Sequence, residues 1–292
     1  MTAQRRIPLS GGVTLNVASA GDPANPPVIL LHGFPESHRT WRLVAPLLAE
    51  RFHLIMPDQR GFGASDRPSE VSAYAPHRLT ADVFALADAL KLERFALVGH
   101  DWGGAIAWTA ALTQDPRLAK LAIVNAPHPW LFQKALIDDP DQRAASQYMN
   151  VFRSPATERM IDAKGFDWFF DRSFSAHVDL AIIPPEERAR YIADWSRPGA
   201  LTAMLNWYRA TGLAVPLPGE DMGLPAWMDQ VPKVRVPTLV MWGMLDPAIL
   251  PGQLIGLEDW VDDLTIERLP DAGHFAPWQA PHEVAAALAG FL

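Results

Sequence analysis

The sequence predicts an α/β fold: a mostly parallel sheet flanked by helices, with an inserted helical cap. Short apolar runs typical of buried strands alternate with segments whose apolar residues recur at three- and four-residue spacing. This alternation favours a parallel sheet that helices cover on both faces. It is interrupted after Asn125 by a long helical and aromatic segment, and strand signals return only at Val236. An insert of this kind is expected to form a cap.

The strands are expected at residues 13–18, 28–31, 53–56, 95–98, 121–124, 238–242 and 264–269. Helices are expected at residues 41–49, 79–92, 105–112 and 281–292. Residues 1–126 and 226–292 should therefore form one core domain. Residues 127–225 should form the cap, which the chain enters through Asn125-Ala126-Pro127-His128-Pro129 and leaves through the Pro- and Gly-rich stretch 215–225.

The composition narrows the classes of function. With 292 residues, of which 49% are hydrophobic and 20% charged, the chain can bury a sizeable core. The absence of cysteine excludes disulfides, thiolate nucleophiles and cysteine-based metal sites. A net charge of −8 without a Lys/Arg cluster speaks against nucleic acid or an anionic membrane as a partner. No apolar run is long enough for a signal peptide or a membrane span, so we expect a cytoplasmic protein.

Residues 95–105 have the pattern of a strand, a sharp turn and a helix start, with Asp101 at the centre of a G-x-D-x-G motif. Gly99 and Gly103 suit an elbow in which the helix packs close to the sheet. An ionised carboxylate needs no base to act as a nucleophile and suits displacement at a saturated carbon. Asp101 is therefore the candidate nucleophile, and the alternative is that it caps the helix that begins near Gly103.

Two further residues complete a catalytic set. Asp246 follows the strand at 238–242 and His274 follows the strand at 264–269, so the chain order is Asp101, Asp246, His274. Nucleophile, acid and base have this order in the α/β-hydrolase fold, each at the carboxyl end of a strand. His274 is expected to take a proton from the water that attacks an Asp101 ester, while Asp246 orients its ring. Four other histidines are expected to be surface or capping residues: His32, His38, His53 and His128.

The loop His32-Gly33-Phe34-Pro35 follows the strand at 28–31, where this fold supplies an oxyanion donor from a backbone N–H. The main-chain N–H groups of Phe34 and Trp102 are the expected oxyanion hole. The alternative is that this loop is an ordinary turn.

Together these motifs resemble the epoxide hydrolases of the α/β-hydrolase fold, essentially along the whole chain. The segments that carry the resemblance are His32-Gly33-Phe34-Pro35-Glu36-Ser37, Asp58-Gln59-Arg60-Gly61-Phe62-Gly63, Gly99-His100-Asp101-Trp102-Gly103-Gly104, Asn125-Ala126-Pro127-His128-Pro129 and Leu205-Asn206-Trp207-Tyr208-Arg209. The resemblance implies a small apolar or aromatic epoxide and water as the partners, a vicinal diol as product, and neither cofactor nor metal. The expected substrate contacts are Phe34, Trp102, Trp207 and Phe275.

An epoxide leaves as an alkoxide, which is a poor leaving group, so ring opening needs an acid that faces the nucleophile. A neutral phenol can donate that proton or hydrogen bond. Of the 4 tyrosines in the chain, Tyr148, Tyr191 and Tyr208 lie in the insert and Tyr74 lies outside it. The resemblance implies Tyr208 as one lid tyrosine and Tyr148 as the other, with Tyr191 as the alternative to Tyr148.

Other functions stay open at this point. Haloalkane dehalogenases share the Asp nucleophile, but they commonly have Asn where Phe34 stands, and many have a carboxylate where Asn125 stands. Fluoroacetate dehalogenases are set aside because Trp102 and Ala105 occupy the positions where their arginines would lie. A ligand-binding protein that kept the fold without turnover is the alternative from another class. The oligomeric state and the natural substrate are not determined by the sequence.

Overall fold

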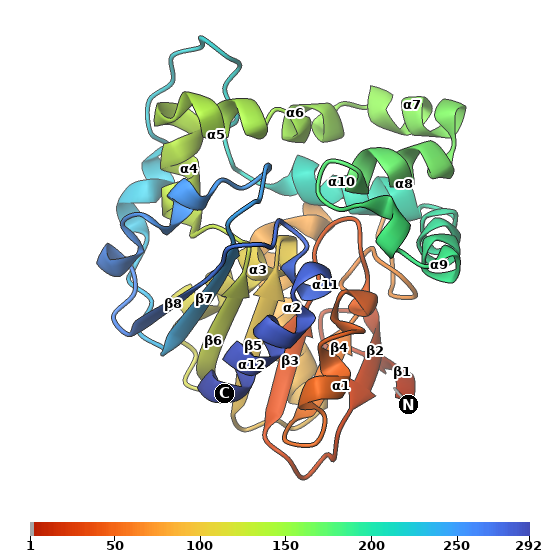
Figure 1. The fold of residues 1–292 in the computed structure, drawn as a ribbon, viewed down its shortest axis with the longest axis vertical. Coiled ribbons are helices and arrows are strands. Elements are labelled where there is room, and N and C mark those ends of the chain that lie inside the picture. Colours follow the sequence, from red (N-terminus) through yellow and green to blue (C-terminus); the bar gives the residue numbers. More distant parts are fainter. Residues whose placement is uncertain (1–2) are drawn as a thin grey trace.

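The computed structural model describes residues 3–292 and is built around an eight-stranded sheet with the order β1-β2-β4-β3-β5-β6-β7-β8 (Figure 1). The strands are β1 (Ala3–Pro8), β2 (Thr14–Ala20), β3 (Pro27–Leu31), β4 (His53–Pro57), β5 (Phe95–His100), β6 (Leu118–Val124), β7 (Thr238–Gly243) and β8 (Leu264–Leu269). β2 pairs antiparallel with β1 and with β4, and all other neighbours are parallel. The predicted mostly parallel α/β sheet is confirmed.

Two local predictions were incomplete or wrong. The strand β1 was not expected because its sequence carries Arg5 and Arg6 instead of an apolar run, and it pairs only with β2 at the edge of the sheet. The helix expected at 41–49 is reduced to one α-helical turn, α1 (Ala45–Leu48), after the 3-10 turn η1 (His38–Trp41). Pro46 explains the difference, because proline suits the first turn of a helix but not its interior.

Helices cover both faces of the sheet and enclose two apolar cores. On one face lie α2 (Pro76–Ala89) and α3 (Trp102–Leu112), and on the other lie α1 and α12 (Pro281–Phe291). Side chains alternate along β3, with Ile29 and Leu31 in the first core and Val28 and Leu30 in the second. This alternation is the two-residue period of a strand that is buried on both faces.

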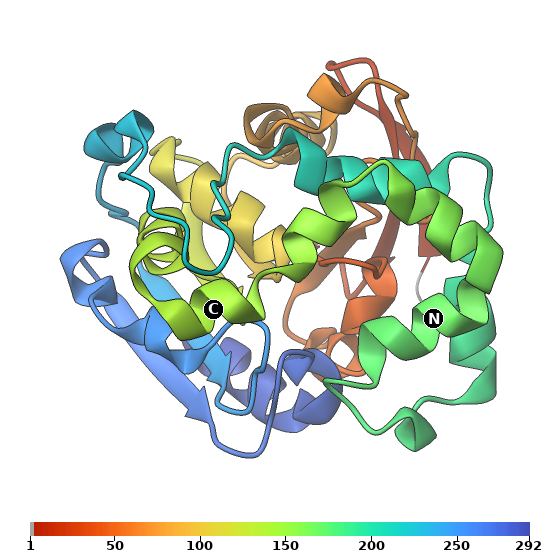
Figure 2. The ribbon, with the colours of Figure 1, turned by 90° about the horizontal axis from the view of Figure 1, so that it is seen from above.

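The segment between β6 and β7 supplies a layer of helices that lies above one end of the sheet (Figures 1 and 2). Its helices are α4 (Pro129–Asp138), α5 (Pro140–Ala145), α6 (Tyr148–Arg153), α7 (Ala156–Lys164), α8 (Phe166–Phe174), α9 (Pro185–Trp195) and α10 (Ala200–Ala210), with the 3-10 turn η3 (Leu180–Ile182). The chain returns to the core through an irregular stretch and η4 (Ala226–Gln230). We call this layer the cap; its domain boundaries at residues 127 and 225 stay a prediction.

Short elements complete the core: η2 (Val71–Tyr74), η5 (Pro251–Leu254), η6 (Leu257–Asp259) and α11 (Ala276–Gln279). Within residues 3–292, no helix combines the length and the apolar character that crossing a bilayer would require.

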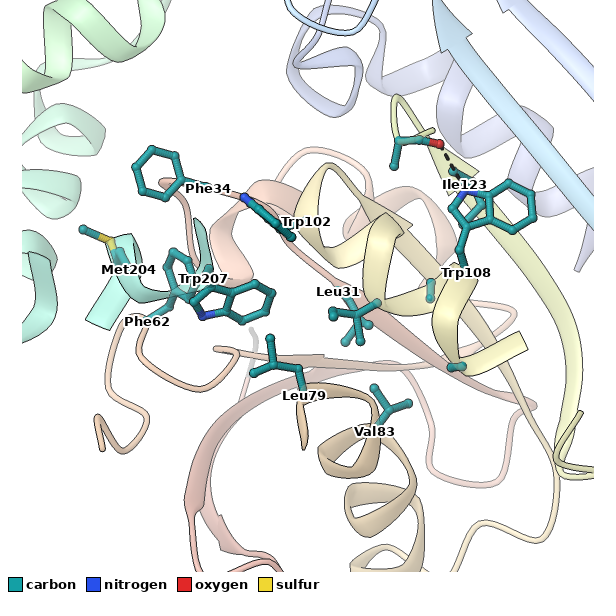
Figure 3. Close-up of a cluster of buried hydrophobic side chains, with 14 of the residues drawn as sticks. Leu31, Phe34, Phe62, Leu79, Val83, Trp102, Trp108, Ile123, Met204 and Trp207 are labelled. Carbon is teal, nitrogen blue, oxygen red and sulfur yellow. Dashed lines mark hydrogen bonds between the residues drawn. The ribbon is translucent and has the colours of Figure 1, made fainter. Parts of the chain in front are cut away.

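Aromatic side chains fix the cap on the core. Trp207 of α10 packs edge-on against Phe62, with ring centroids 5.3 Å apart, and against Trp102, with centroids 5.9 Å apart (Figure 3). Such edge-to-face pairs add to the free energy gained from burying the rings. Because α10 is held in this way, the next residue, Tyr208, comes to lie against Trp102, with ring centroids 5.1 Å apart.

Candidate active site

Asp101 occupies a strained turn between β5 and α3. Its backbone has φ 52° and ψ −123°, a conformation that few residues other than glycine adopt. A Cβ at Gly99 or Gly103 would overlap backbone atoms of the adjoining helix or strand, which confirms the close packing predicted at these two positions. The Asp101 side chain makes no capping hydrogen bond to α3, so the helix-cap alternative is wrong. Instead its Oδ1 accepts a hydrogen bond of 2.7 Å from the backbone N–H of Phe34.

The structure brings the three predicted residues together at the carboxyl ends of β5, β7 and β8. His274 Nδ1 lies 2.7 Å from Asp246 Oδ2, and His274 Nε2 lies 3.5 Å from Asp101 Oδ2. The imidazole therefore bridges two carboxylates, and its Nε2 points at the candidate nucleophile. Asp246 and His274 are buried, so water screens these charges only weakly.

Asn125 is a member of the site that sequence reasoning missed. Its Nδ2 donates a hydrogen bond of 2.9 Å to Asp246 Oδ2, and its Oδ1 accepts one of 2.9 Å from the backbone N–H of Gly243. Asp246 Oδ1 also accepts hydrogen bonds from the backbone N–H groups of Ala248 and Ile249, at 2.9 and 3.0 Å. The available signal was the position of Asn125 directly after β6, the strand that pairs with β7.

The charges of the three residues stabilise one another. Burial opposes ionisation of Asp101, but His274 more than offsets this effect, and the pKa of Asp101 is lowered. The same balance of burial against His274 lowers the pKa of Asp246. Burial would lower the pKa of His274, yet Asp246 first and Asp101 second raise it to about 10. At neutral pH the site thus holds one imidazolium between two carboxylates.

Two cap tyrosines lie opposite Asp101. Tyr148 begins α6 and Tyr208 lies on α10, with their ring centroids 6.2 Å apart, and both line the cavities that reach Asp101. Burial raises the pKa of both phenols well above the ordinary value, and the negative charge of Asp101 adds to this effect. Both phenols therefore stay protonated and able to donate.

The other two tyrosines are engaged elsewhere. The Tyr191 hydroxyl donates to Glu36 Oε1 at 3.1 Å, and the Tyr74 hydroxyl donates to the carbonyl oxygen of Pro68 at 2.8 Å. Neither ring lines a cavity at Asp101. Of the two alternatives left open by the sequence, the structure places Tyr148 at the site and Tyr191 away from it.

Two cavities, of about 350 and 570 Å³, meet at Asp101, Tyr148 and Tyr208. The smaller one has mainly apolar walls that include Trp102. The walls of the larger one include Phe34, Phe275, His274, Arg172, Ser173 and His177. A ligand at the carboxylate thus has apolar space on one side and a partly polar chamber on the other.

The two tryptophans of the expected site, Trp102 and Trp207, differ in their surroundings. Within residues 3–292, the Trp102 N–H makes no hydrogen bond to Asp101, so its oxyanion role stays a prediction. Trp207 lines neither cavity: it is 1% exposed, and its Nε1 donates to the carbonyl oxygen of Arg60 at 3.0 Å. The expectation that Trp207 contacts the substrate is therefore wrong, since its ring fastens α10 to the core (Figure 3).

Two of the histidines expected at the surface are fully buried. His32 accepts a hydrogen bond of 2.9 Å at Nε2 from the Gln59 backbone N–H, and His128 stacks on Trp260. Burial lowers the pKa of His128 to about 3, so it lies in the core as a neutral ring. Within residues 3–292, no group of three or more His, Asp or Glu side chains is arranged to hold a metal ion.

Comparison with known proteins gives a consistent result over nearly the whole chain. Residues 26–281 match the family model of the alpha/beta hydrolase fold. The chain is 34% identical to Epoxide hydrolase A of Mycobacterium tuberculosis, over 98% of this chain and 96% of that protein. A solved structure described as a novel epoxide hydrolase from metagenomes of hot environments has a TM-score of 0.93 and 44% identity, covering 100% and 98% of the two chains. The crystal structure of Bacillus megaterium epoxide hydrolase in complex with an inhibitor has a TM-score of 0.84 and 26% sequence identity, covering 98% of this chain and 99% of that chain.

Proposed function

Because the chain belongs to the family of the α/β-hydrolase fold, we propose that it is an epoxide hydrolase that opens its substrate through an ester on Asp101. One observation carries the proposal. A partly buried carboxylate lies between a backbone N–H donor, a histidine at 3.5 Å and two cap phenols, at the point where two cavities meet. The relatives described as epoxide hydrolases support the substrate class.

In the first step, Asp101 Oδ2 forms a bond to one ring carbon of the epoxide. Oδ1 is held by the Phe34 N–H, whereas Oδ2 lies 3.5 Å from His274 Nε2 and accepts no hydrogen bond from a backbone N–H of residues 3–292, which makes Oδ2 the attacking atom. The carbon–oxygen bond of the ring breaks, and its electron pair goes to the oxygen. This oxygen takes a proton from Tyr148 or Tyr208. The proton carried by His274 then restores the phenol, because a buried phenolate is the stronger base.

In the second step, neutral His274 takes a proton from water at Nε2 while the water oxygen bonds to Cγ of Asp101. The loss of the negative charge on Asp101 removes one cause of the raised pKa of His274 and prepares it to act as a base. The oxyanion that forms at Oδ1 is held by the Phe34 N–H. The bond between Cγ and Oδ2 then breaks, and the departing alkoxide takes the proton left on the new hydroxyl. Ionised Asp101, protonated His274 and a vicinal diol result.

A substrate panel tests this proposal against the two alternatives. Purified protein is incubated with aryl and alkyl epoxides and, separately, with chloroalkanes and bromoalkanes of matched size. Diol formation without halide release is the expected result. Halide release would assign the chain to the haloalkane dehalogenases, and binding without turnover of either class would make it a ligand-binding protein.

A further inference from the structure

The cap places a second histidine beside His274. His177 follows α8, and its ring centroid lies 5.4 Å from that of His274 and 5.4 Å from that of Phe275. His177 and His274 both line the larger cavity and neither lines the smaller one. The water that His274 activates must therefore lie in the chamber into which His177 projects.

The side chain of Gln279 holds this arrangement together. Its Nε2 donates a hydrogen bond of 3.0 Å to the backbone oxygen of His177, and its Oε1 accepts one of 3.0 Å from the backbone N–H of Gly273. Gly273 immediately precedes His274, so one amide joins the cap segment to the loop that carries the candidate base. Two hydrogen bonds from a single planar group fix the spacing of the two histidines better than either would alone.

The ring of His177 has unused hydrogen-bonding capacity. Its Nδ1 is buried and has no hydrogen-bond partner among residues 3–292. Burial first, and the neighbouring charge of His274 second, lower the pKa of His177 to about 4, so the ring is neutral in the working range of most enzymes. A buried polar atom that lacks a protein partner commonly bonds to water.

We propose that His177 binds the hydrolytic water together with His274 and orients its lone pair toward Cγ of the Asp101 ester. This inference rests on the proposed function and adds a water-positioning residue from the cap to the second step. One proton of the water goes to His274 Nε2, and the water oxygen bonds to Cγ. His177 gains and loses no proton in this step. It keeps one hydrogen bond to the water, either to the oxygen or to the hydrogen that remains on it. Because the water is used only after the ester exists, ring opening does not depend on His177.

The test separates the two steps in a single-turnover experiment with excess protein and an aryl epoxide. Loss of epoxide gives the rate of ring opening, and the mass of the intact protein gives the formation and decay of the ester. His177→Phe keeps a ring of similar size and removes both nitrogens. It should leave ring opening near its original rate and slow ester decay about tenfold, since one hydrogen bond to the reacting water is lost. His177→Asn places a polar atom near the position of Nδ1 and should restore most of the rate of decay.

His128→Phe is the matched control, because His128 is another buried histidine whose ring nitrogens have no hydrogen-bond partner in the described part of the chain, and it lines neither cavity. It should leave the ratio of the two rates unchanged. Ester decay at the original rate in His177→Phe would overturn the inference, as would equal slowing of both steps in His177→Phe and His177→Asn, which would indicate packing alone. If no ester forms in the unchanged protein or in any variant, the proposed function itself fails.

Discussion

Replacement of Asn125 by alanine tests the support beneath Asp246. Asn125 is fully buried and adopts φ 44°, in the left-handed region, where asparagine is tolerated better than alanine. The Asn125→Ala change removes the donor to Asp246 Oδ2 and the acceptor of the Gly243 N–H, both at 2.9 Å. It therefore leaves the buried Gly243 N–H without its acceptor, removes one of the two hydrogen bonds to Asp246 Oδ2, which keeps the bond to His274 Nδ1, and strains the backbone.

The expected cost follows from these three losses. The unsatisfied Gly243 N–H costs about 1–3 kcal/mol, the lost hydrogen bond to the charged Asp246 about 1.5–3 kcal/mol, and the left-handed conformation costs alanine about 1 kcal/mol more. We expect the free energy of unfolding to fall by about 3.5–7 kcal/mol. Ester decay should slow about tenfold, because Asp246 Oδ2, the atom that holds His274 Nδ1, loses its other hydrogen bond and fixes the direction of the His274 ring less well. Ring opening should change little, since Asp101 itself is untouched.

Urea unfolding followed by tryptophan fluorescence measures the first effect, and single-turnover kinetics measure the second. Asn16→Ala is the matched control, because Asn16 Nδ2 also donates at 2.9 Å to Oδ2 of a buried aspartate, Asp58, which lies outside the site. The control should lose stability and keep both rates. The reasoning is refuted if Asn125→Ala is no less stable than Asn16→Ala, or if it slows ring opening as much as ester decay.

Three further predictions concern the acid, the base and the approach to the nucleophile. Tyr148→Phe and Tyr208→Phe should each slow ring opening, and the double variant should slow it about 10²–10⁴-fold with little effect on ester decay, as stopped-flow and intact-mass measurements would show. The pKa of His274 is raised to about 10 in the folded protein, above its ordinary value near 6.5, so its stabilising contribution is complete below pH 6.5 and is lost as the pH rises through 10. Unfolding free energies measured between pH 6 and 10 should therefore fall in the unchanged protein, and this slope should be weaker in His274→Gln. Gly33→Ala would place a Cβ on the Asp101 carboxylate and should abolish ester formation. Gly252→Ala is the control, because a Cβ at position 252 would meet open space, and it should leave ester formation unchanged. An active Gly33→Ala variant would contradict the observed geometry.

Much of the core could be predicted because its signals are local. A buried parallel strand is a short apolar run, and the residue after such a run lies at the carboxyl edge of the sheet, which is how Asp101, Asp246 and His274 were found. The strand β1 escaped notice because an edge strand with two arginines has no apolar run. The inner strands can be predicted from the sequence because they are buried on both faces and therefore form continuous apolar runs.

The parts that escaped prediction depend on contacts between distant segments. Asn125 and Asp246 are separated by 121 positions, and Gln279 and His177 by 102, so no local pattern relates them. The prediction that Trp207 contacts the substrate was wrong because Trp207 and Tyr208, although adjacent on α10, point in different directions. Tyr208 faces the cavities, whereas Trp207 reaches down to the backbone of Arg60.

The origin of the oxygen atoms tests the central claim of the proposed mechanism most directly. A single turnover is run with excess protein in water enriched in oxygen-18, and both the diol and the peptide that contains Asp101 are analysed by mass spectrometry. An ester on Asp101 predicts an unlabelled diol and one heavy oxygen in the Asp101 carboxylate, because water attacks Cγ and the diol keeps the oxygen that Asp101 supplied. A labelled diol with an unlabelled Asp101 would mean that water attacks the epoxide itself, and would contradict the proposed mechanism.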